Sequence, residues 1–161
     1  MFRIGVIGYG YWGPNIVRNF NATDGAKVVS VCDKNPNALG RLKKSYPGIL
    51  TTLESRDIIT APDIDIVTVI TPVSTHYALA KDALLNGKHV FVEKPFTSTA
   101  AQAEELIEIA EKKGLKIMVD HTFLFTSAVK KIKQIIEDDV LGDLYYYDST
   151  RVNLGLFQHD V

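Results

Sequence analysis

The segment FRIGVIGYGYWGPN, residues 2–15, sets the fold of this chain. An apolar run leads directly into the loop GYGYWG, residues 8–13, and a segment of helical character begins at Pro14. When G-x-G-x-x-G joins a strand to a helix, its first glycine makes the tight turn, its second lets the backbone approach a pyrophosphate, and its third allows close packing. A plain tight turn is the alternative, and the flanking strand and helix argue against it.

Further apolar runs bounded by turn residues alternate with segments of helical period. The predicted strands are residues 2–8, 27–32, 65–70, 88–93 and 115–120. The clearest helix lies within residues 97–114, where one face carries Ala103, Leu106, Ile107 and Ala110 and Gly114 ends the helix. This alternation predicts an α/β fold of the Rossmann type, a doubly wound parallel sheet with helices on both faces.

The regular alternation of predicted strands and helices ends after Asp120. Residues 127–142 are predicted as another helix, and residues 143–155 as a half-exposed strand because their apolar side chains alternate. We therefore expect an NAD(P)-binding Rossmann domain over residues 1–122 and the beginning of a second domain over residues 123–161. Because the second part is too short to bury a core, we expect the chain to be a piece of a longer protein.

Composition excludes several classes of function. The 161 residues are 46% hydrophobic, and 18 Lys and Arg balance 19 Asp and Glu for a net charge of -1, without the basic stripe that nucleic acid would require. Cys32 is the sole cysteine, so we expect neither an internal disulfide nor a cysteine-based metal site. No apolar run reaches the length of a membrane span. A cytoplasmic protein with no membrane or nucleic-acid partner is expected.

An acidic residue follows the second predicted strand. Asp33 lies twenty positions after Gly13, where a carboxylate can accept hydrogen bonds from the ribose hydroxyls of an adenosine. The alternative is a turn or helix-capping aspartate before Lys34-Asn35-Pro36. Since a carboxylate repels a 2′-phosphate, NAD is the expected cofactor, and the adjacent Lys34 leaves NADP open.

Two later strands also end in polar residues. Thr71-Pro72 follows residues 65–70, with Ser74 or Thr75 as a candidate N-cap and His76 in the first helical turn. His76 is predicted either to hydrogen-bond a substrate or the nicotinamide ribose, or to point into solvent.

The segment KHVFVEKPFT, residues 88–97, places Glu93 and Lys94 at the end of a strand and stops it with Pro95. At the carboxyl edge of a parallel sheet, Lys94 can exchange a proton with a ligand or act as a fixed positive charge beside a developing alkoxide. The alternative is a surface lysine whose stem packs on apolar neighbours.

These motifs, in this order and over the whole chain, resemble the glucose-fructose oxidoreductase, inositol dehydrogenase and rhizopine catabolism (Gfo/Idh/MocA) family. Within the family, GYGYWGPN, HTFLF and TRVNLG most resemble the UDP-N-acetylglucosaminuronate 3-dehydrogenase branch. The resemblance implies an NAD(P)-dependent dehydrogenase acting on a CH–OH group of a sugar or nucleotide sugar. It also implies a second α/β domain that completes the sugar site and a homo-oligomer.

The resemblance assigns roles to particular residues. Lys94 matches the active-site lysine, and Pro95 a proline that often follows a cis peptide bond. His121 and Arg151 are candidate substrate-pocket residues, with a core histidine and a surface arginine as the alternatives. The predicted cofactor-binding residues are Gly8, Gly10, Tyr11, Trp12, Gly13, Asp33, Lys34, Thr71, Pro72, His76, Glu93 and Lys94.

Parts of the chain depart from the family pattern. Asp120 replaces an expected small residue, and the adjacent His159 and Asp160 do not match the aspartate and histidine that lie one helical turn apart in the family's second domain. The chain alone is therefore expected to be inactive. A non-enzymatic NAD(P) sensor of the same fold and a methyltransferase are the rival functions. The predicted strand at residues 143–155 would expose an edge, so we expect it to be disordered or to pair with its copy in a second molecule.

Overall fold

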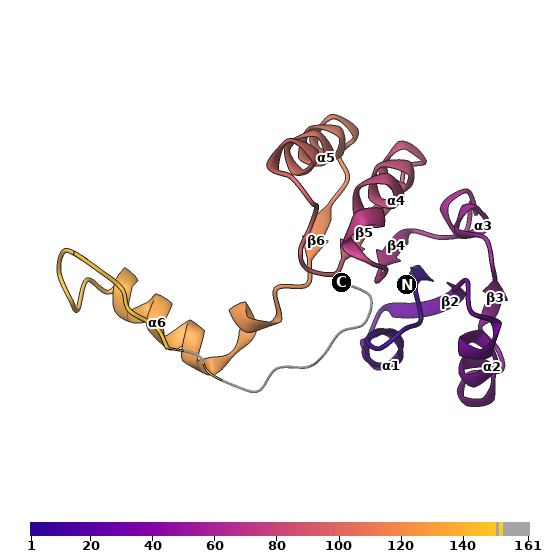
Figure 1. Cartoon of the computed structure of the whole chain (residues 1–161), viewed down its shortest axis with the longest axis horizontal. Coiled ribbons are helices and arrows are strands. Elements are labelled where there is room, and N and C mark those ends of the chain that lie inside the picture. The colour runs from indigo at the N-terminus through magenta and orange to yellow at the C-terminus, as the bar shows by residue number, and fades with distance from the viewer. Residues whose placement is uncertain (151, 153–161) are drawn as a thin grey trace. The chain divides into compact units, whose positions relative to one another are not determined.

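The computed structural model describes residues 1–150 and 152 (Figure 1). The chain divides into two compact units, Met1–Asp120 and His121–Val161. The first unit contains one sheet of six strands in the order β3-β2-β1-β4-β5-β6, and every neighbouring pair is parallel. The strands are β1 (Phe2–Ile7), β2 (Ala26–Cys32), β3 (Leu50–Thr52), β4 (Ile66–Val69), β5 (His89–Val92) and β6 (Ile117–Val119).

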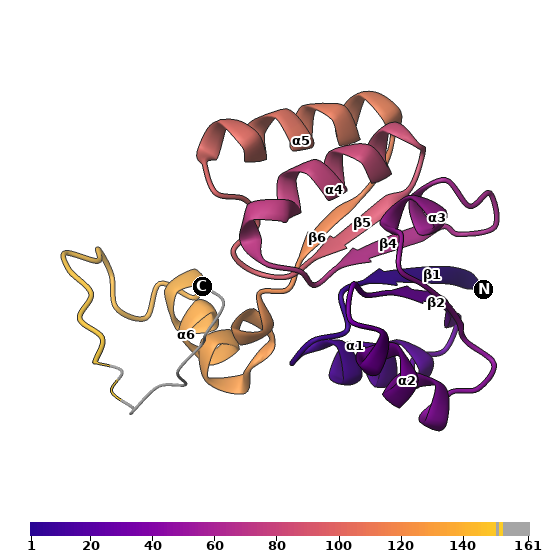
Figure 2. The ribbon, with the colours of Figure 1, turned by 45° about the vertical axis from the view of Figure 1, so that its right-hand side comes forward.

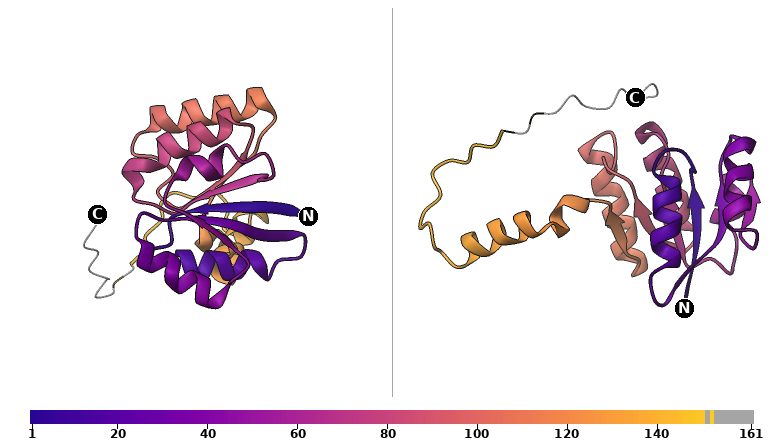
Figure 3. Two further views of the ribbon diagram at one scale, coloured as in Figure 1. Left: turned by 90° about the vertical axis from the view of Figure 1, so that its right-hand side faces the viewer. Right: turned by 90° about the horizontal axis from the view of Figure 1, so that it is seen from below.

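Helices cover both faces of this sheet, which confirms the predicted Rossmann fold (Figures 2 and 3). One face packs against α1 (Gly13–Asn21) and α2 (Pro36–Ser45). The other packs against α3 (Ser55–Ile59), α4 (Val73–Leu85) and α5 (Ala100–Lys113). Because β1 lies between β2 and β4, the strand order reverses beside β1, and the carboxyl ends of β1 and β4 border the place where such sheets bind ligands.

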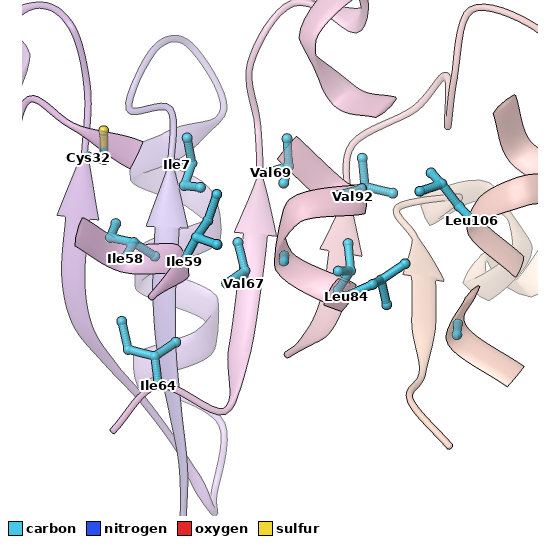
Figure 4. Close-up of a cluster of buried hydrophobic side chains, with 14 residues drawn as sticks. Ile7, Cys32, Ile58, Ile59, Ile64, Val67, Val69, Leu84, Val92 and Leu106 are labelled. Atoms are coloured by element: carbon cyan, nitrogen blue, oxygen red, sulfur yellow. The ribbon is translucent and has the colours of Figure 1, made fainter. Parts of the chain in front are cut away.

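Two apolar clusters hold the layers together. Figure 4 shows the cluster under α3, α4 and α5, in which Val67 and Val69 of β4 and Val92 of β5 meet Leu84 and Leu106 from the helices. The second cluster lies on the other face of the sheet, where side chains of β1 and β2 pack against α1 and α2. Strands buried on both faces need apolar side chains at successive positions, which explains the continuous apolar runs of the sequence.

The helix predicted within residues 97–114 forms as α5. Thr99 caps it by accepting a hydrogen bond from the Gln102 N–H, and Gly114 ends it in the left-handed conformation at φ 66°. On the apolar face that the sequence predicted, Leu106 and Ala110 are buried, but Ile107 is 46% exposed. The side of α5 that packs on the sheet includes Ile109 in place of Ile107.

The second unit, described by itself, contains a 3-10 turn, η1 (Thr122–Phe125), and the helix α6 (Ser127–Glu137). The strand predicted at residues 143–155 does not form over residues 143–150, which have no regular structure, and Tyr145 and Tyr147 are exposed. No strand in the described part of this unit offers a neighbour, and a strand alone lacks ladder hydrogen bonds. Arg151 and residues 153–161 lie outside the described residues. Among the described helices, none has the length and apolar character needed to cross a membrane.

Candidate functional site

In the loop between β1 and α1, glycine is favoured at each of the three positions 8, 10 and 13 for a different reason. Gly8 has φ +101°, and a Cβ there would lie 2.4 Å from the carbonyl oxygen of Ile70, so the fold itself excludes a side chain. At Gly13 a Cβ would lie 3.0 Å from Cδ2 of Tyr9, at the packing of the helix against the loop. A Cβ at Gly10 would meet no protein atom within 4 Å. The protein leaves open the space beside Gly10, where the pattern predicts close approach of a pyrophosphate.

The start of α1 has features that favour binding of an anion. The helix begins at Gly13, has a proline in its first turn, and has no side-chain cap at Trp12. The first N–H groups of a helix and its dipole together favour a phosphate. Tyr11 and Trp12 are 73% and 44% exposed, and their rings meet edge to face with centroids 5.3 Å apart. This end of α1 fits the pyrophosphate of a dinucleotide.

Asp33 is held by the backbone at the end of β2. Its Oδ2 accepts a hydrogen bond from the Tyr9 N–H at 2.6 Å, and its Oδ1 accepts one from the Asn35 N–H at 2.7 Å. Asn35, and not Asp33, caps α2 by accepting from the Asn37 N–H at 3.0 Å. Each carboxylate oxygen has a second lone pair, so the carboxylate can still accept from ribose hydroxyls. Lys34 is exposed beside it.

The turn after β4 lies against the glycine loop. The methyl carbon of Thr71 would be 3.2 Å from a Cβ at Gly8. The Thr75 hydroxyl donates to the carbonyl oxygen of Pro72 at 2.8 Å, and its Oγ1 lies 2.7 Å from Oγ1 of Thr71, from which it can accept. The helix α4 begins at Val73 with Pro72 at the cap and no side-chain cap bond. The prediction of Ser74 or Thr75 as the N-cap was therefore wrong, because the helix begins earlier and the Thr75 hydroxyl donates to the turn.

His76 is in the first turn of α4, as predicted, but its side chain is only 1% exposed. Its Nδ1 lies 2.9 Å from the carbonyl oxygen of Pro95, and its Nε2 lies 2.7 Å from the carbonyl oxygen of Thr71. The ring neither points into solvent nor keeps a nitrogen free for a ligand. This differs from the direct contact with a substrate or ribose that the sequence suggested.

The end of β5 carries the lysine. The Lys94–Pro95 peptide bond is cis. The Lys94 side chain is 57% exposed, and its Nζ lies 3.7 Å from Oε1 of Glu93, whose side chain is 15% exposed. The Glu93 N–H donates to the carbonyl oxygen of Val69 at 2.9 Å, which ties this position to the end of β4. An ammonium or amine at Lys94 is thus accessible at the carboxyl edge of the sheet.

Glu93 has a second carboxyl group beside it. Val92 pairs with Val119 in register, and the Asp120 N–H donates to the carbonyl oxygen of Val92 at 2.9 Å, so Asp120 follows β6 directly opposite Glu93. Burial raises the pKa of Glu93, Asp120 raises it further by charge repulsion and a hydrogen bond, and Lys94 lowers it. Asp120 was seen in the sequence only as a departure from a pattern, and its pairing with Glu93 was missed.

The structure brings most of the predicted residues of the first unit to one edge of the sheet. Gly8 donates to the carbonyl oxygen of Cys32 at 2.8 Å, Tyr9 contacts Asp33, and His76 joins the turns that contain Thr71 and Pro95. His121 is exposed in the second unit, and Arg151 lies outside the described residues, so their predicted roles stay predictions. The residues that reasoning from sequence missed are Asn35, Pro95 as the partner of His76, and Asp120.

Comparison with known proteins agrees with this geometry. Residues 2–121 match a family described as "Oxidoreductase family, NAD-binding Rossmann fold" (GFO_IDH_MocA). The uncharacterized oxidoreductase YdgJ of Escherichia coli is 33% identical over 147 residues, which are 91% of this chain and 42% of that protein. The chain therefore spans about two fifths of the length of that relative.

Two solved structures extend the comparison. The apo scyllo-inositol dehydrogenase of Lactobacillus casei has a TM-score of 0.81 at 26% identity, covering 89% of this chain and 43% of that one. The biliverdin reductase of Synechocystis, solved with biliverdin and NADP+, has a TM-score of 0.77 at 27% identity, covering 84% and 42%. The open space at Gly10 and the uncapped start of α1 suit the pyrophosphate of a nicotinamide dinucleotide, and the carboxylate of Asp33 suits one whose ribose hydroxyls are free. The chain belongs to the Gfo/Idh/MocA oxidoreductase family, of which it carries the NAD(P)-binding Rossmann domain.

Proposed function

We propose that the chain is the nucleotide-binding part of an NAD-dependent dehydrogenase whose substrate is a sugar or nucleotide sugar. In the oxidative direction a CH–OH group becomes a ketone: the carbon gives a hydride to NAD+, which becomes NADH, and the hydroxyl gives up a proton. The observation that carries the proposal is the place of Lys94, accessible at the same sheet edge as the glycine loop. A proton partner is needed there because the hydroxyl proton must leave as the hydride does.

The residues of the first unit have separate roles in this proposal. The loop at Gly10, Tyr11 and Trp12 and the start of α1 hold the pyrophosphate, and Asp33 accepts from the adenosine ribose. Thr71 and Pro72 border the nicotinamide side. The nicotinamide supplies the hydride acceptor, and Lys94 takes up the hydroxyl proton or stabilises the alkoxide.

The substrate class rests on motifs and relatives together. The scyllo-inositol dehydrogenase among the similar structures acts, by its name, on a polyhydroxylated ring. The likeness of GYGYWGPN and HTFLF to the nucleotide-sugar branch favours a nucleotide sugar within this class. The expected second domain, beginning at residue 123, would complete the sugar site and the oligomer, so the chain alone is expected to bind the cofactor without turnover.

Binding of the cofactor tests the proposal first. Trp12 is the single tryptophan of the chain and lies in the glycine loop, so its fluorescence should be quenched by energy transfer to a bound reduced nicotinamide. We expect saturable quenching by NADH, weaker quenching by NADPH, and no heat of binding for S-adenosylmethionine in calorimetry. A protein that binds only S-adenosylmethionine would be a methyltransferase, and the proposal would be wrong.

Turnover by the full-length protein then separates a dehydrogenase from the sensor alternative. A panel of nucleotide sugars, free sugars and inositols with NAD+ should give NADH with one substrate class. NADH binding without turnover on any of them would favour the sensor. The presence of Lys94 argues against that outcome, because a sensor has no use for a proton partner.

A further inference from the structure

His76 connects two turns that belong to different strands. Its ring is buried, and it lies within hydrogen-bonding distance of a carbonyl oxygen in each turn: Pro95 at 2.9 Å from Nδ1 and Thr71 at 2.7 Å from Nε2. The first turn follows β5 and contains Lys94. The second follows β4 and lies against Gly8 of the glycine loop. A single side chain therefore joins the lysine turn to the Thr71 turn, and the Thr71 turn in its own right lies against the glycine loop.

The chemistry of the contact makes His76 difficult to replace. Both partners are carbonyl oxygens, which only accept hydrogen bonds, so the ring must donate wherever a bond forms. A neutral imidazole has one N–H and donates to one carbonyl oxygen at a time, and both nitrogens donate only in the imidazolium form. Its rigid ring places a nitrogen at each of the two turns, within hydrogen-bonding distance of both carbonyl oxygens. Glutamine carries its N–H donors on one nitrogen at the end of a flexible chain, and leucine has no donor.

Besides this contact, the turn that carries Lys94 is held by Phe96, which packs against the apolar cluster under α3, α4 and α5, and by the Ser98 N–H, which donates to Oε1 of Gln102 at 3.2 Å. Sheet hydrogen bonding on this strand continues to the Glu93 N–H, which donates to the Val69 carbonyl oxygen at 2.9 Å. Beyond it, residues 94–99 have no regular secondary structure. The Lys94 side chain is exposed, and its described ion pair with Glu93 is long, at 3.7 Å. The carbonyl of Pro95 is therefore a principal point at which the backbone next to Lys94 is held.

We propose that His76 is a positioning residue that fixes the Lys94 turn relative to the Thr71 turn and the glycine loop. It touches neither cofactor nor substrate, and it acts through Lys94 by setting where the amine sits beside the nicotinamide. This rests on the proposed dehydrogenase function. Because a displacement of about 1 Å at a reacting group can cost about 10²-fold in rate, a loose turn would show mainly in kcat.

A double-mutant cycle in the full-length enzyme tests the proposal. We expect His76→Leu to lower kcat by about 10-fold to 10²-fold and the NADH affinity, read from Trp12 fluorescence, much less. His76→Gln, which keeps one hydrogen bond, should recover part of kcat. In a Lys94→Ala background, His76→Leu should cause little further loss, because the group it positions is gone. If His76→Leu lowers kcat by the same factor in the wild-type and Lys94→Ala backgrounds, the two effects are independent and the proposal is wrong.

Hydrogen exchange of the 161-residue chain gives a readout that does not depend on turnover. In His76→Leu, which keeps neither hydrogen bond, amides of residues 94–99 should exchange faster while those of β5 stay unchanged and report an intact fold; equal exchange of residues 94–99 in this variant and the wild type would overturn the anchoring role. Ser74→Ala, an exposed substitution in the same helical turn, is the control and should change neither exchange nor kcat. If Lys94→Ala alone leaves kcat intact, the proposed function fails, whereas additivity in the cycle removes only the role of His76.

Discussion

The backbone N–H of Tyr9 donates a hydrogen bond of 2.6 Å to Oδ2 of Asp33, joining the glycine loop after β1 to the end of β2. The other carboxylate oxygen accepts from Asn35 at 2.7 Å. Asp33 thus holds the glycine loop and the turn after β2 in place, and in the proposed function it also accepts from the adenosine ribose. The two alternatives drawn from the sequence, a ribose acceptor and a turn aspartate, are compatible, because one carboxylate has enough lone pairs for both.

Replacing Asp33 by alanine should change cofactor preference more than stability. A hydrogen bond to a charged group contributes about 1.5–3 kcal/mol, so NADH affinity should fall by about 10-fold or more. NADPH affinity should hold or rise because the carboxylate no longer repels the 2′-phosphate. Loss of the two backbone contacts should cost about 1–2 kcal/mol of folding free energy. Titration with both cofactors and urea denaturation measure these changes.

Asp33→Asn is the matched variant for that experiment. It keeps an oxygen acceptor and removes the charge, so it should raise NADPH affinity relative to wild type with a smaller loss of stability than alanine. Equal affinity of the wild-type chain for NADH and NADPH would contradict the ribose role. An Asp33→Ala chain that unfolds would show that the contacts of the carboxylate with Tyr9 and Asn35 are essential to the fold, and Asp33→Asn would then carry the test of the ribose role.

The glycines at positions 8 and 10 should respond in opposite ways to alanine. Gly8→Ala forces a side chain into a positive φ and within 2.4 Å of the Ile70 carbonyl oxygen, so it should destabilise the fold by several kcal/mol or prevent folding. Gly10→Ala meets no protein atom within 4 Å and should leave the melting temperature almost unchanged. Its added methyl group should nevertheless weaken NADH binding by about 10-fold, because the pyrophosphate must approach this backbone. Thermal melting and NADH titration of both variants check this pair.

An outcome in which Gly10→Ala binds NADH as tightly as wild type would mean that the pyrophosphate does not lie beside this glycine. Gly40→Ala is a suitable control, because Gly40 is an exposed position of α2 where a Cβ also meets nothing within 4 Å. It should leave NADH binding unchanged and raise stability slightly, since alanine favours a helix interior.

Elements with a strong local signal were predictable from the sequence. The strand, glycine loop and helix over residues 2–21 form as predicted, and Gly114 ends α5 in a left-handed conformation. β3, of three residues, was missed because so short a strand shows no periodicity of its own. Residues 143–150 show the opposite failure, since an alternating pattern predicts a strand only where a neighbouring strand is present to pair with it.

The sequence predicted which residues lie at the candidate site better than it predicted which groups they contact. Motif spacing pointed to Asp33, Thr71 and Lys94, because the carboxyl ends of parallel strands meet at one edge. The partners of His76 are backbone carbonyl groups 5 and 19 positions away. Every residue has such a group, so the sequence does not show which of them a side chain contacts. The pairing of Glu93 with Asp120 depends on the register of β5 with β6, which the sequence does not state.

The carboxyl group of Glu93 should make folding depend on pH. Burial first, and then Asp120, raise its pKa, so the folded chain holds this proton more tightly than the unfolded chain does. The stability associated with the protonated group is complete below the unfolded pKa of about 4.3 and is lost as the pH rises through the folded value. Glu93→Gln, which cannot ionise, should therefore be more stable than wild type near neutral pH. The advantage should shrink toward pH 4 in urea denaturation.

Two variants separate this effect from a general loss of negative charge. Asp120→Asn removes the repulsion on Glu93 and should reduce the advantage of a second Glu93→Gln substitution. Glu108→Gln, at an exposed position of α5 paired with Lys112, is the control for removing one surface charge. A Glu93→Gln chain that is less stable than wild type at every pH would show that its carboxylate is needed as an acceptor for Lys94.

Substitutions at Lys94 in the full-length protein address the chemistry directly. Lys94→Met keeps an apolar stem of similar length and removes the amine, and it should lower kcat by about 10²-fold or more, the usual contribution of a positioned acid or base. NADH binding should stay close to wild type, because the proposed pyrophosphate and ribose contacts lie at the glycine loop and Asp33. Lys94→Arg keeps the positive charge but does not release a proton in proteins, so it distinguishes the two roles left open by the sequence. Activity near wild type in Lys94→Arg would identify a fixed charge that stabilises the alkoxide. Activity as low as that of Lys94→Met would identify a proton carrier, and unchanged kcat in Lys94→Met would remove Lys94 from the reaction altogether.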